Sequence, residues 1–284
     1  MNRLPPWFKQ GLPNGLYQER LNLFKDLTLN TVCQSAHCPN MGFCFKQGRA
    51  TFLILGDICT RNCRFCAVKK GNPQALNLKE PSNLAKTIQR LNLNYVAITS
   101  VTRDDLNDGG ASQFVRCVRE ISYLNASKKI ELLIPDFQGK RDSLGMVIGS
   151  KPDVICHNLE TVFRLYAKVR PKANYALSLK ILSQIKQMDK SIFTKSGIML
   201  GLGEREVEVI DLMQDLRQVN CDILTIGQYL APSKNHLPVE RFLLPEEFDK
   251  FKGLGLSLGF KCVQSAPLVR SSYMAQETFR ECLI

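Results

Sequence analysis

Three closely spaced cysteines occur within one short stretch of the sequence, residues 56–66. Cys59, Cys63 and Cys66 are separated by three residues and then by two. This spacing brings three thiols into one loop, where they are close enough to hold a single compact metal centre. We therefore expect metal chemistry at this loop.

A structural zinc site and a ferredoxin site both fit this stretch poorly. Structural zinc normally takes its remaining ligands from a second Cys-x2-Cys pair or a histidine pair, and the sequence has no second such cysteine pair. The bacterial ferredoxin pattern needs a further cysteine followed by proline, whereas Val68 and Lys69 follow here. Three thiolates on a four-iron cluster leave one iron without a protein ligand, which is typical of a catalytic metal. A loop of unliganded cysteines is the less favoured alternative.

The loop resembles the signature of the radical SAM superfamily, which also has an aromatic residue, here Phe65, before the last cysteine. By this resemblance, the free iron binds the amino and carboxylate groups of S-adenosylmethionine (SAM). The reduced cluster then cleaves SAM and releases a 5′-deoxyadenosyl radical.

A second group of cysteines lies closer to the N-terminus. Cys33, Cys38 and Cys44 are separated by four residues and then by five, whereas plant-type ferredoxins need a gap of two after the gap of four. A proline and a glycine in this stretch predict a turn-rich loop that could wrap a cluster. His37 lies within it and could be a zinc ligand, although a histidine in such a loop is more often solvated.

The length and composition are those of an ordinary globular protein. The 284 residues can form one large domain, and 44% hydrophobic with 23% charged residues is an average balance. No apolar run approaches the length of a membrane span, and the N-terminus lacks the apolar core of an export signal. We therefore expect a cytoplasmic protein that does not contact a membrane, in which eleven cysteines favour metal ligation over disulfide bonds.

The formal net charge of +12 points to an anionic partner. Lys and Arg are spread over the whole chain and do not form the concentrated patch that nucleic-acid binding needs. We expect an acidic protein or an anionic ligand, and no nucleic acid. Arg61 and Arg64 would also offset the negative charge of a thiolate cluster.

Strands and helices alternate along most of the chain. Strands are predicted at 51–56, 95–101, 130–134, 154–157, 195–200 and 222–226. Helices are predicted at 15–29, 82–91 (with Ser82 as N-cap), 111–124, 142–148, 175–188, 204–219 and 245–256. This alternation implies parallel strands with right-handed crossovers, and hence an α/β barrel or open sheet.

Polar residues gather at the carboxyl end of each predicted strand. In a barrel these ends share one face, and that face carries the active site. Turn chemistry can explain any single group, but six groups together favour a site. In strand order, the residues are Cys59; Thr99, Ser100, Arg103, Asp104 and Asp105; Pro135 and Asp136; His157 and Asn158; Gly201 and Gly203; and Gln228 and Tyr229.

Two further sets of residues have simpler explanations. Asp104 and Asp105 could form an acid–base pair, but Arg103 and the following Asn-Asp-Gly-Gly turn favour local hydrogen bonding. Isolated cysteines are usually small buried side chains, so we assign no role to the five that stand alone. These are Cys117, Cys156, Cys221, Cys262 and Cys282.

The two cysteine groups and several later phrases resemble the lipoyl synthase family within the radical SAM superfamily. The likeness runs from about Cys33 to about Tyr273. The first cysteine group distinguishes this family from other radical SAM enzymes, and the Arg-Ser-Ser-Tyr phrase at 270–273 points the same way. The other matching phrases stand at 54–57, 99–101, 103–106, 135–137, 157–161, 197–204 and 228–230.

The resemblance implies roles for individual residues. The ligands of the SAM-binding [4Fe–4S] cluster would be Cys59, Cys63 and Cys66. The ligands of an auxiliary [4Fe–4S] cluster would be Cys33, Cys38, Cys44 and Ser272. Serine oxygen is a harder ligand than thiolate, so it would let one iron leave during catalysis. The candidate SAM contacts are Thr99, Ser100, Asn158 and Glu160.

The fold implied by the resemblance is α/β, a partial (β/α)6 TIM-type barrel at 51–260. An N-terminal extension at 1–50 would carry the auxiliary-cluster cysteines, and a C-terminal extension at 261–284 the serine ligand. The implied reaction inserts two sulfur atoms at C6 and C8 of a protein-bound octanoyl-lysine and consumes the auxiliary cluster as sulfur donor. Unactivated C–H bonds resist polar catalysis, so a radical from a cofactor is needed.

The implied partners are an octanoylated lipoyl carrier domain or H protein, a reducing electron donor such as flavodoxin or ferredoxin, and iron–sulfur cluster delivery proteins. The sequence departs from the family's usual residues at Phe163, Ala266 and Met274, none of which is a cluster ligand. Biotin synthase and tRNA methylthiotransferases lack the first cysteine group at this spacing or carry an RNA-binding domain, for which this chain ends too soon. An electron carrier or metal-storage protein would not need a barrel with a polar face.

Overall fold

A single eight-stranded sheet organises the fold. In the computed structural model, which describes residues 4–9, 15–124 and 127–283, its strands lie in the order β1-β2-β5-β6-β7-β8-β9-β10. β1 (Asn30–Thr31) runs antiparallel to β2, and the other neighbouring strands are parallel. Within the described residues β1 and β10 do not pair with each other, so the sheet forms a partial barrel that stays open.

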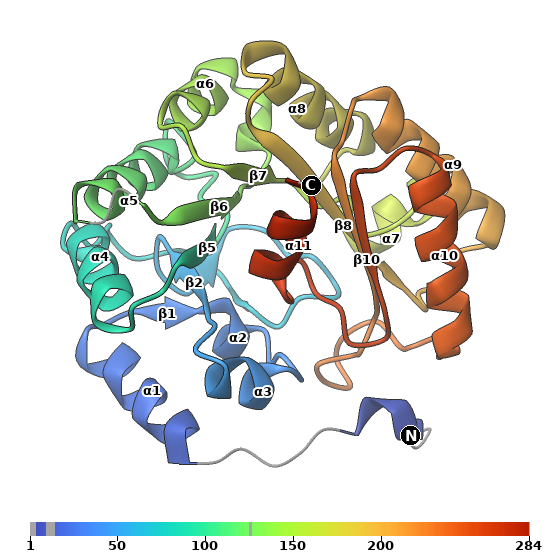
Figure 1. Ribbon diagram of the computed structural model, residues 1–284, viewed down its shortest axis with the longest axis horizontal. Coiled ribbons are helices and arrows are strands. Elements are labelled where there is room, and N and C mark those ends of the chain that lie inside the picture. The colour runs from blue at the N-terminus through green and yellow to red at the C-terminus, as the bar shows by residue number, and fades with distance from the viewer. Residues whose placement is uncertain (1–3, 10–14, 125–126, 284) are drawn as a thin grey trace.

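Helices surround the strands, and Figure 1 shows them as an outer ring. The parallel strands are β2 (Thr51–Ile54), β5 (Tyr95–Ser100), β6 (Lys129–Leu133), β7 (Val154–Cys156), β8 (Phe193–Leu200), β9 (Ile223–Gln228) and β10 (Cys262–Ser265). The ring consists of α4 (Glu80–Arg90), α5 (Ala111–Leu124), α6 (Arg141–Gly149), α8 (Tyr175–Met188), α9 (Glu206–Gln218) and α10 (Pro245–Ser257). Helix α11 (Ala275–Glu281) instead lies across the centre of the view (Figure 1).

The predicted alternation of strands and helices is confirmed. Every predicted strand and helix is present, with ends that agree within three residues, and β10 adds a seventh parallel strand. The N-cap predicted at Ser82 is wrong, because α4 begins at Glu80 and the Ser82 hydroxyl donates to the Lys79 carbonyl at 3.0 Å. The division into extensions and barrel stays a prediction, and its N-terminal extension includes residues outside the described ones.

The N-terminal part packs beside β1 and β2. After α1 (Gly15–Asp26), the stretch that was expected to be a turn-rich loop contains two short helices, α2 (Val32–Ser35) and α3 (Met41–Lys46), on either side of a turn. The Thr31 hydroxyl caps α2 by accepting from the backbone N–H of Gln34 at 3.3 Å. The two helices therefore hold a segment that the sequence predicted as irregular.

The core lies between the sheet and the inner faces of the helices. In α5, Phe114, Val118 and Ile121 are spaced four and then three residues apart, so they share one face, and all three are buried. On the sheet, Val96 and Ile98 of β5 are buried against such faces. None of the helices in the described ranges has both the length and the apolar character to cross a bilayer.

An ion pair is buried on the sheet. Lys195 of β8 donates to both carboxylate oxygens of Glu131 of β6, at 2.9 and 3.0 Å. The Tyr95 hydroxyl donates to the same carboxylate at 2.6 Å. Removing one partner would leave an uncompensated buried charge, so the three side chains fix the spacing of β5, β6 and β8.

The C-terminal segment crosses the sheet and then covers its amino-terminal end. A Cβ on Gly227 of β9 would lie 2.0 Å from the carbonyl oxygen of Val269, so the segment passes directly against this glycine. Further on, the ring of Phe279 in α11 lies 5.7 Å from that of Tyr95 and 5.6 Å from that of Phe193, between ring centroids. Because Tyr95 and Phe193 begin β5 and β8, α11 packs at the amino ends of these strands.

A disulfide bond joins Cys262 in β10 to Cys282 after α11. We expected no role for either cysteine and no disulfide, and this expectation was wrong, because only the fold brings the two residues together. The other isolated cysteines, Cys117, Cys156 and Cys221, are buried and free. The disulfide fixes both ends of the C-terminal segment to the sheet.

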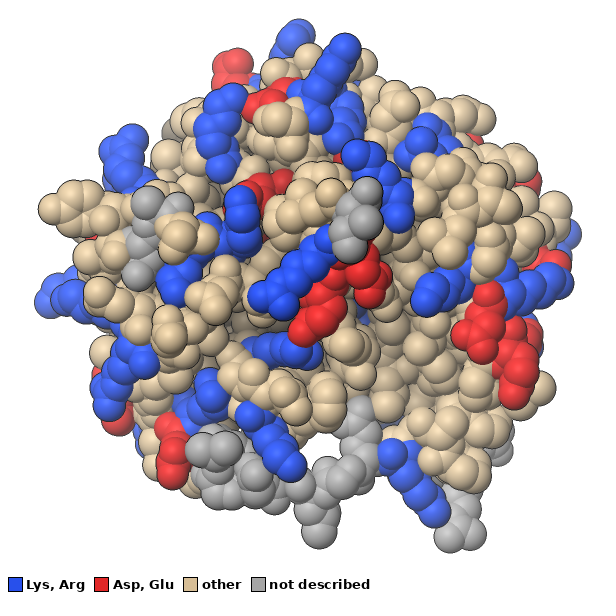
Figure 2. All heavy atoms as spheres, viewed as in Figure 1, with Lys and Arg blue, Asp and Glu red and all other residues tan. Residues whose placement is uncertain are grey.

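Positive charge is spread over the molecular surface. Figure 2 shows Lys and Arg distributed around the face seen in Figure 1, without one patch that dominates it. Several of these cations are paired locally, for example Lys151 with Asp189 at 2.6 Å and Lys129 with Asp153 at 2.8 Å. The face therefore has a general positive character.

Two candidate cysteine sites

The Cys59 loop leaves the carboxyl end of β2 and is fixed by backbone contacts. Cys59 lies in β3 (Ile58–Cys59), which pairs with β4 (Lys69–Lys70). The backbone N–H groups of Thr102 and Arg61 donate to its sulfur at 3.3 and 3.4 Å. These two donors fix the position of the Cys59 sulfur beside the ends of β2 and β5.

Burial raises the pKa of the other two thiols in this loop. The pKa of Cys66 is raised to about 12, and that of Cys63 is raised although the nearby charge of Arg170 opposes the effect of burial. Such thiols stay protonated at neutral pH unless a metal replaces the proton. Cys63 and Cys66 would therefore become thiolates when a metal centre binds.

We had expected Arg61 to offset the negative charge of the cysteine thiolates. In the structure its guanidinium pairs with two carboxylates instead. Its guanidinium donates to Asp104 at 2.8 and 2.9 Å and to Asp136 at 2.5 and 2.6 Å. Burial alone would lower the pKa of Arg61, but the two carboxylates outweigh burial and raise it. Asp105 instead binds Arg103 at 2.8 Å, so Asp104 and Asp105 form separate ion pairs and not an acid–base dyad. The Arg61 pairs tie the cysteine loop to the ends of β5 and β6.

Two of the candidate SAM contacts, Thr99 and Ser100, end β5. Neighbouring residues on a strand project to opposite faces, so these two side chains cannot approach one ligand from the same face of the sheet. The Thr99 hydroxyl donates to the carbonyl of Leu133 at 3.1 Å. The Ser100 hydroxyl is buried and has no hydrogen-bond partner in the described part of the chain.

The other two candidates, Asn158 and Glu160, lie together after β7. Asn158 Nδ2 donates to Glu160 Oε1 at 3.0 Å and to Ser271 Oγ at 2.5 Å. Glu160 has a left-handed backbone with φ of 68°, and its N–H donates to the carbonyl of Gly197 at 2.9 Å. A non-glycine residue pays energy for this conformation, and residues held in this way are concentrated at functional sites.

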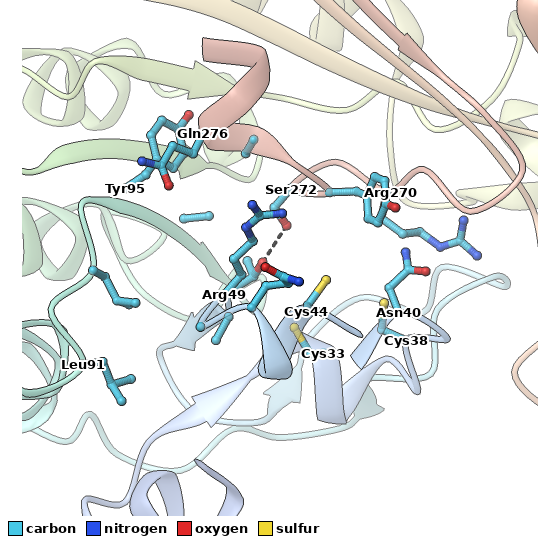
Figure 3. Close-up of a pocket in the computed structure, with 18 of the residues that line it drawn as sticks. Cys33, Cys38, Asn40, Cys44, Arg49, Leu91, Tyr95, Arg270, Ser272 and Gln276 are labelled. Carbon is cyan, nitrogen blue, oxygen red and sulfur yellow. Dashed lines mark hydrogen bonds between the residues drawn. The ribbon is translucent and has the colours of Figure 1, made fainter. Parts of the chain in front are cut away.

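The second group of cysteines lines a cavity of about 240 Å³ near the amino end of β2. Cys33, Cys38 and Cys44 come from α2, α3 and the turn between them, and Ser272 reaches the cavity from the C-terminal segment (Figure 3). Figure 3 shows the cysteines on one side of this space and Ser272 on the other. Folding alone joins the serine to the cysteines, because more than half of the sequence separates them.

Thr51, the first residue of β2, connects Ser272 with Cys33. Its hydroxyl oxygen lies 2.6 Å from that of Ser272. Burial raises the pKa of Cys33 to about 11, although hydrogen bonds from Thr51 act in the opposite direction. Burial likewise raises the pKa of Cys44 to about 12. This site therefore also holds protonated thiols that a metal centre would convert to thiolates.

Two contacts attach the C-terminal segment to the cysteine helices. Asn40 Nδ2 donates to the carbonyl of Leu268 at 2.6 Å, and Arg49 pairs with Glu277. Asn40 lies between Cys38 and Cys44, so the first contact joins the cysteine turn directly to the segment that carries the serine.

Both cysteine groups supply thiols, the ligand type that holds iron–sulfur clusters. No three His, Cys, Asp or Glu side chains among the described residues are close enough to share one metal ion. His37 is exposed with φ of 51°, which agrees with a solvated turn residue.

The two sites lie at opposite ends of the parallel strands. The Cys59 loop follows the carboxyl end of β2, whereas Thr51 and Ser272 meet at the amino end of the same strand. A four-residue strand spans roughly 10 Å. The two cysteine groups are therefore separated by at least the length of β2.

Comparison with known proteins identifies the family. A family model described as the radical SAM superfamily matches residues 53–216. Lipoyl synthase from Caldicellulosiruptor saccharolyticus is 52% identical over 275 residues, which cover 96% of each chain. Lipoyl synthase from Caldanaerobacter subterraneus subsp. tengcongensis is 53% identical over 273 residues, again 96% of each chain. The chain belongs to the lipoyl synthase family of radical SAM enzymes. Like other members of this family, it is a sulfur-inserting enzyme that uses iron–sulfur chemistry and SAM.

Solved structures show the same fold at low sequence identity. Methylornithine synthase has a TM-score of 0.55 at 16% identity and covers 76% of this chain and 71% of its own. Coproporphyrinogen III oxidase from Escherichia coli has a TM-score of 0.54 at 13% identity and covers 79% of this chain and 57% of its own. These likenesses support the radical SAM fold, while the lipoyl synthase relatives supply the family.

Proposed function

We propose that this lipoyl synthase family member inserts sulfur at C6 and C8 of an octanoyl chain carried on a lysine of a partner protein. The auxiliary cluster is the sulfur donor and is consumed as a substrate. The observation that carries this proposal is the cavity where Cys33, Cys38, Cys44 and Ser272 meet, away from the Cys59 loop. A single cluster site would suffice for SAM cleavage, and a second donor set is what sulfur transfer requires.

The Cys59 loop has the ligands for the SAM-binding cluster. A cluster held by Cys59, Cys63 and Cys66 would, with SAM, supply the radical that breaks unactivated C–H bonds. Asn158 and Glu160 are the proposed SAM contacts at this end of the barrel. Burial raises the pKa of Glu160, and its carboxylate can accept hydrogen bonds from a ligand at the same time as from Asn158.

At the other site Ser272 is proposed to be a labile ligand. Its oxygen is harder than a thiolate and suits iron–sulfur chemistry less well, so this iron is released more easily than the others. Thr51 Oγ1 lies 2.6 Å away and can donate a hydrogen bond to the serine oxygen while that oxygen is deprotonated. The Thr51 hydroxyl therefore stabilises the serine in both its bound and its released form.

The proposed partners follow from the charge and from the reaction. With a net charge of +12, the protein suits an acidic octanoylated carrier domain and an acidic electron donor such as flavodoxin or ferredoxin. Because the auxiliary cluster is consumed, cluster delivery proteins must restore it after each product. A cytoplasmic location is proposed for the same reason, since these partners operate there.

The experiment compares two substrates with the anaerobically reconstituted enzyme. An octanoyl-lysine carrier domain and free octanoic acid are each incubated with SAM and reductant, and products are identified by mass spectrometry. We expect two sulfur atoms to be added on the carrier domain only, from enzyme that contains about eight iron and eight sulfide per chain. Product from free octanoic acid alone, or full activity with about four iron per chain, would contradict the proposal.

A further inference from the structure

Arg170 lies between the Cys59 loop and the residues after β7. Its Nη1 donates to the carbonyl oxygen of Asn158 at 2.8 Å and to that of Leu159 at 3.3 Å. The same nitrogen donates to the Tyr166 hydroxyl at 2.7 Å, and the guanidinium lies 5.3 Å from the centroid of the Tyr166 ring. These contacts fix the guanidinium firmly against the loop that carries Asn158.

One donor of this guanidinium is not used by the surrounding protein. Arg170 Nε is buried and has no hydrogen-bond partner within the described residues. A buried N–H without an acceptor is destabilising, so such groups are uncommon unless a ligand supplies the acceptor. The hydrogen bonds to Asn158 and Leu159 therefore leave one buried donor of Arg170 without an acceptor.

A candidate acceptor lies in the cysteine loop. The backbone N–H of Arg64 donates to the carbonyl of Val169 at 2.9 Å, which brings Cys63 and Arg170 side by side. Cys63 and Arg170 therefore lie in two segments that are hydrogen-bonded to each other, and both residues are partly buried there.

We infer that Arg170 is a positioning residue whose guanidinium holds the Cys63 thiolate and ties it to the loop of Asn158 and Glu160. This inference rests on the proposed cluster at Cys59, Cys63 and Cys66. Neutral thiols accept hydrogen bonds weakly, whereas a metal-bound thiolate is a good acceptor. The unused donor therefore gains its partner when Cys63 becomes a ligand.

A guanidinium beside Cys63 affects the reduction potential of the proposed cluster. Hydrogen bonds to ligand sulfur and nearby positive charge stabilise the reduced form of an iron–sulfur cluster, because reduction adds negative charge. Arg170 should therefore raise the reduction potential of the cluster held by the Cys59 loop. The auxiliary site, at the other end of the strands, should not respond to the same residue.

The test is a redox titration of reconstituted wild-type, Arg170→Gln and Arg170→Lys enzymes, followed by electron paramagnetic resonance of the SAM-binding cluster. We expect a more negative midpoint potential in Arg170→Gln and an intermediate one in Arg170→Lys, which keeps the charge but loses the planar fork. Arg119→Gln in α5 is the matched control, since its side chain is exposed, makes no hydrogen bond or ion pair among the described residues, and lies outside the cysteine loop. A wild-type potential in a fully loaded Arg170→Gln would overturn the inference.

The iron content of the Arg170 variants provides a second test of the inference. Loss of only the SAM-binding cluster from Arg170→Gln, with about four iron retained, supports a role at Cys63. Loss of both clusters from both Arg170 variants, with a lower melting temperature of the metal-free protein, would show a general structural role and overturn the inference. If Cys59→Ala leaves iron content and the wild-type spectrum unchanged, the proposed function fails, and that outcome does not depend on Arg170.

Discussion

Ser271 and Ser272 are neighbours in the chain, but their hydroxyl groups serve different sites. Ser272 Oγ lies 2.6 Å from Thr51 in the wall of the auxiliary cavity, whereas Ser271 Oγ accepts from Asn158 Nδ2 at 2.5 Å. Ser272 therefore lies at the proposed auxiliary-cluster site, and Ser271 contacts a proposed SAM-binding residue. A single peptide unit thus links the two proposed sites.

Ser272→Ala and Ser272→Cys should both stop sulfur insertion while SAM cleavage continues. Alanine removes the labile ligand, and cysteine replaces it with a thiolate that holds its iron more tightly. Product analysis by mass spectrometry, together with quantification of 5′-deoxyadenosine, checks this expectation. The control is Ser257→Ala, since that exposed hydroxyl only donates to the carbonyl of Leu254. Normal lipoyl product from Ser272→Ala would exclude the ligand role.

His157 should make stability depend on pH in weak acid. Its Nδ1–H donates to the carbonyl of Ile134 at 2.9 Å, and its Nε2 lies 3.1 Å from the Ser178 hydroxyl oxygen. Burial lowers the pKa of His157 to about 4 from an ordinary value of 6.5. The unfolded chain therefore binds a proton before the folded chain does, and unfolding free energy falls as pH drops from 6.5 to 4.

The size of this effect follows from the shift in pKa. A lowering of this extent corresponds to roughly 3 kcal/mol, fully present above pH 6.5 and lost by about pH 4. Urea denaturation between pH 4 and 8 measures it, with His157→Gln as comparison because glutamine does not titrate. Equal pH dependence in His157→Gln and wild type would show that other groups are responsible.

At the scale of elements, the C-terminal segment depends on a glycine of β9. A Cβ at position 227 would meet the Val269 carbonyl oxygen, so Gly227→Ala must push the segment away from the sheet. We expect a loss of about 1–3 kcal/mol of stability and weaker retention of the auxiliary cluster. Thermal denaturation and iron content check this result. Gly253→Ala in α10 is the control, since nothing lies within 4 Å of its added Cβ, and it should be neutral or stabilising.

The long elements were predictable from sequence because their apolar residues repeat with a clear period. The run at 95–101 and the buried face of α5 are examples, and both agree with the structure. The helices around Cys33 and Cys44 were missed because each has at most six residues, too few to show a period. β10 was missed because its residues, Cys262–Ser265, end in the polar pair Gln264 and Ser265, so no apolar run marks the strand.

The sequence supplied candidate ligands, but it did not indicate the residues that contact them. Cysteine spacing predicted two metal sites and the resemblance supplied Ser272, and these ligand assignments stay predictions. Thr51 and Arg170 carry no such signal, because a threonine at a strand start and an arginine after a short helix are common in any sequence. Their roles follow from packing between segments far apart in the chain, as does the pairing of Cys262 with Cys282.

At the scale of the whole molecule, the two cysteine groups should fail independently. Cys59→Ala should lose SAM cleavage and keep about four iron at the auxiliary site, while Cys44→Ala should keep SAM cleavage and lose sulfur insertion. The physical reason is that the two groups lie at opposite ends of β2 and use different segments of the chain. Iron content and 5′-deoxyadenosine formation measure the two losses. Loss of all iron in either variant would show that the sites assemble together.

The position of the auxiliary cavity at the amino ends of the strands has a consequence for the enzyme's working life. The proposed reaction spends one cluster per product, so the protein alternates between use and repair. Since the Cys59 loop and the Ser272 cavity open from different ends of the barrel, a donor of electrons and a donor of clusters need not compete for one docking surface. Cluster replacement and electron delivery can then take place on the same molecule at the same time. The slower of these two processes limits turnover.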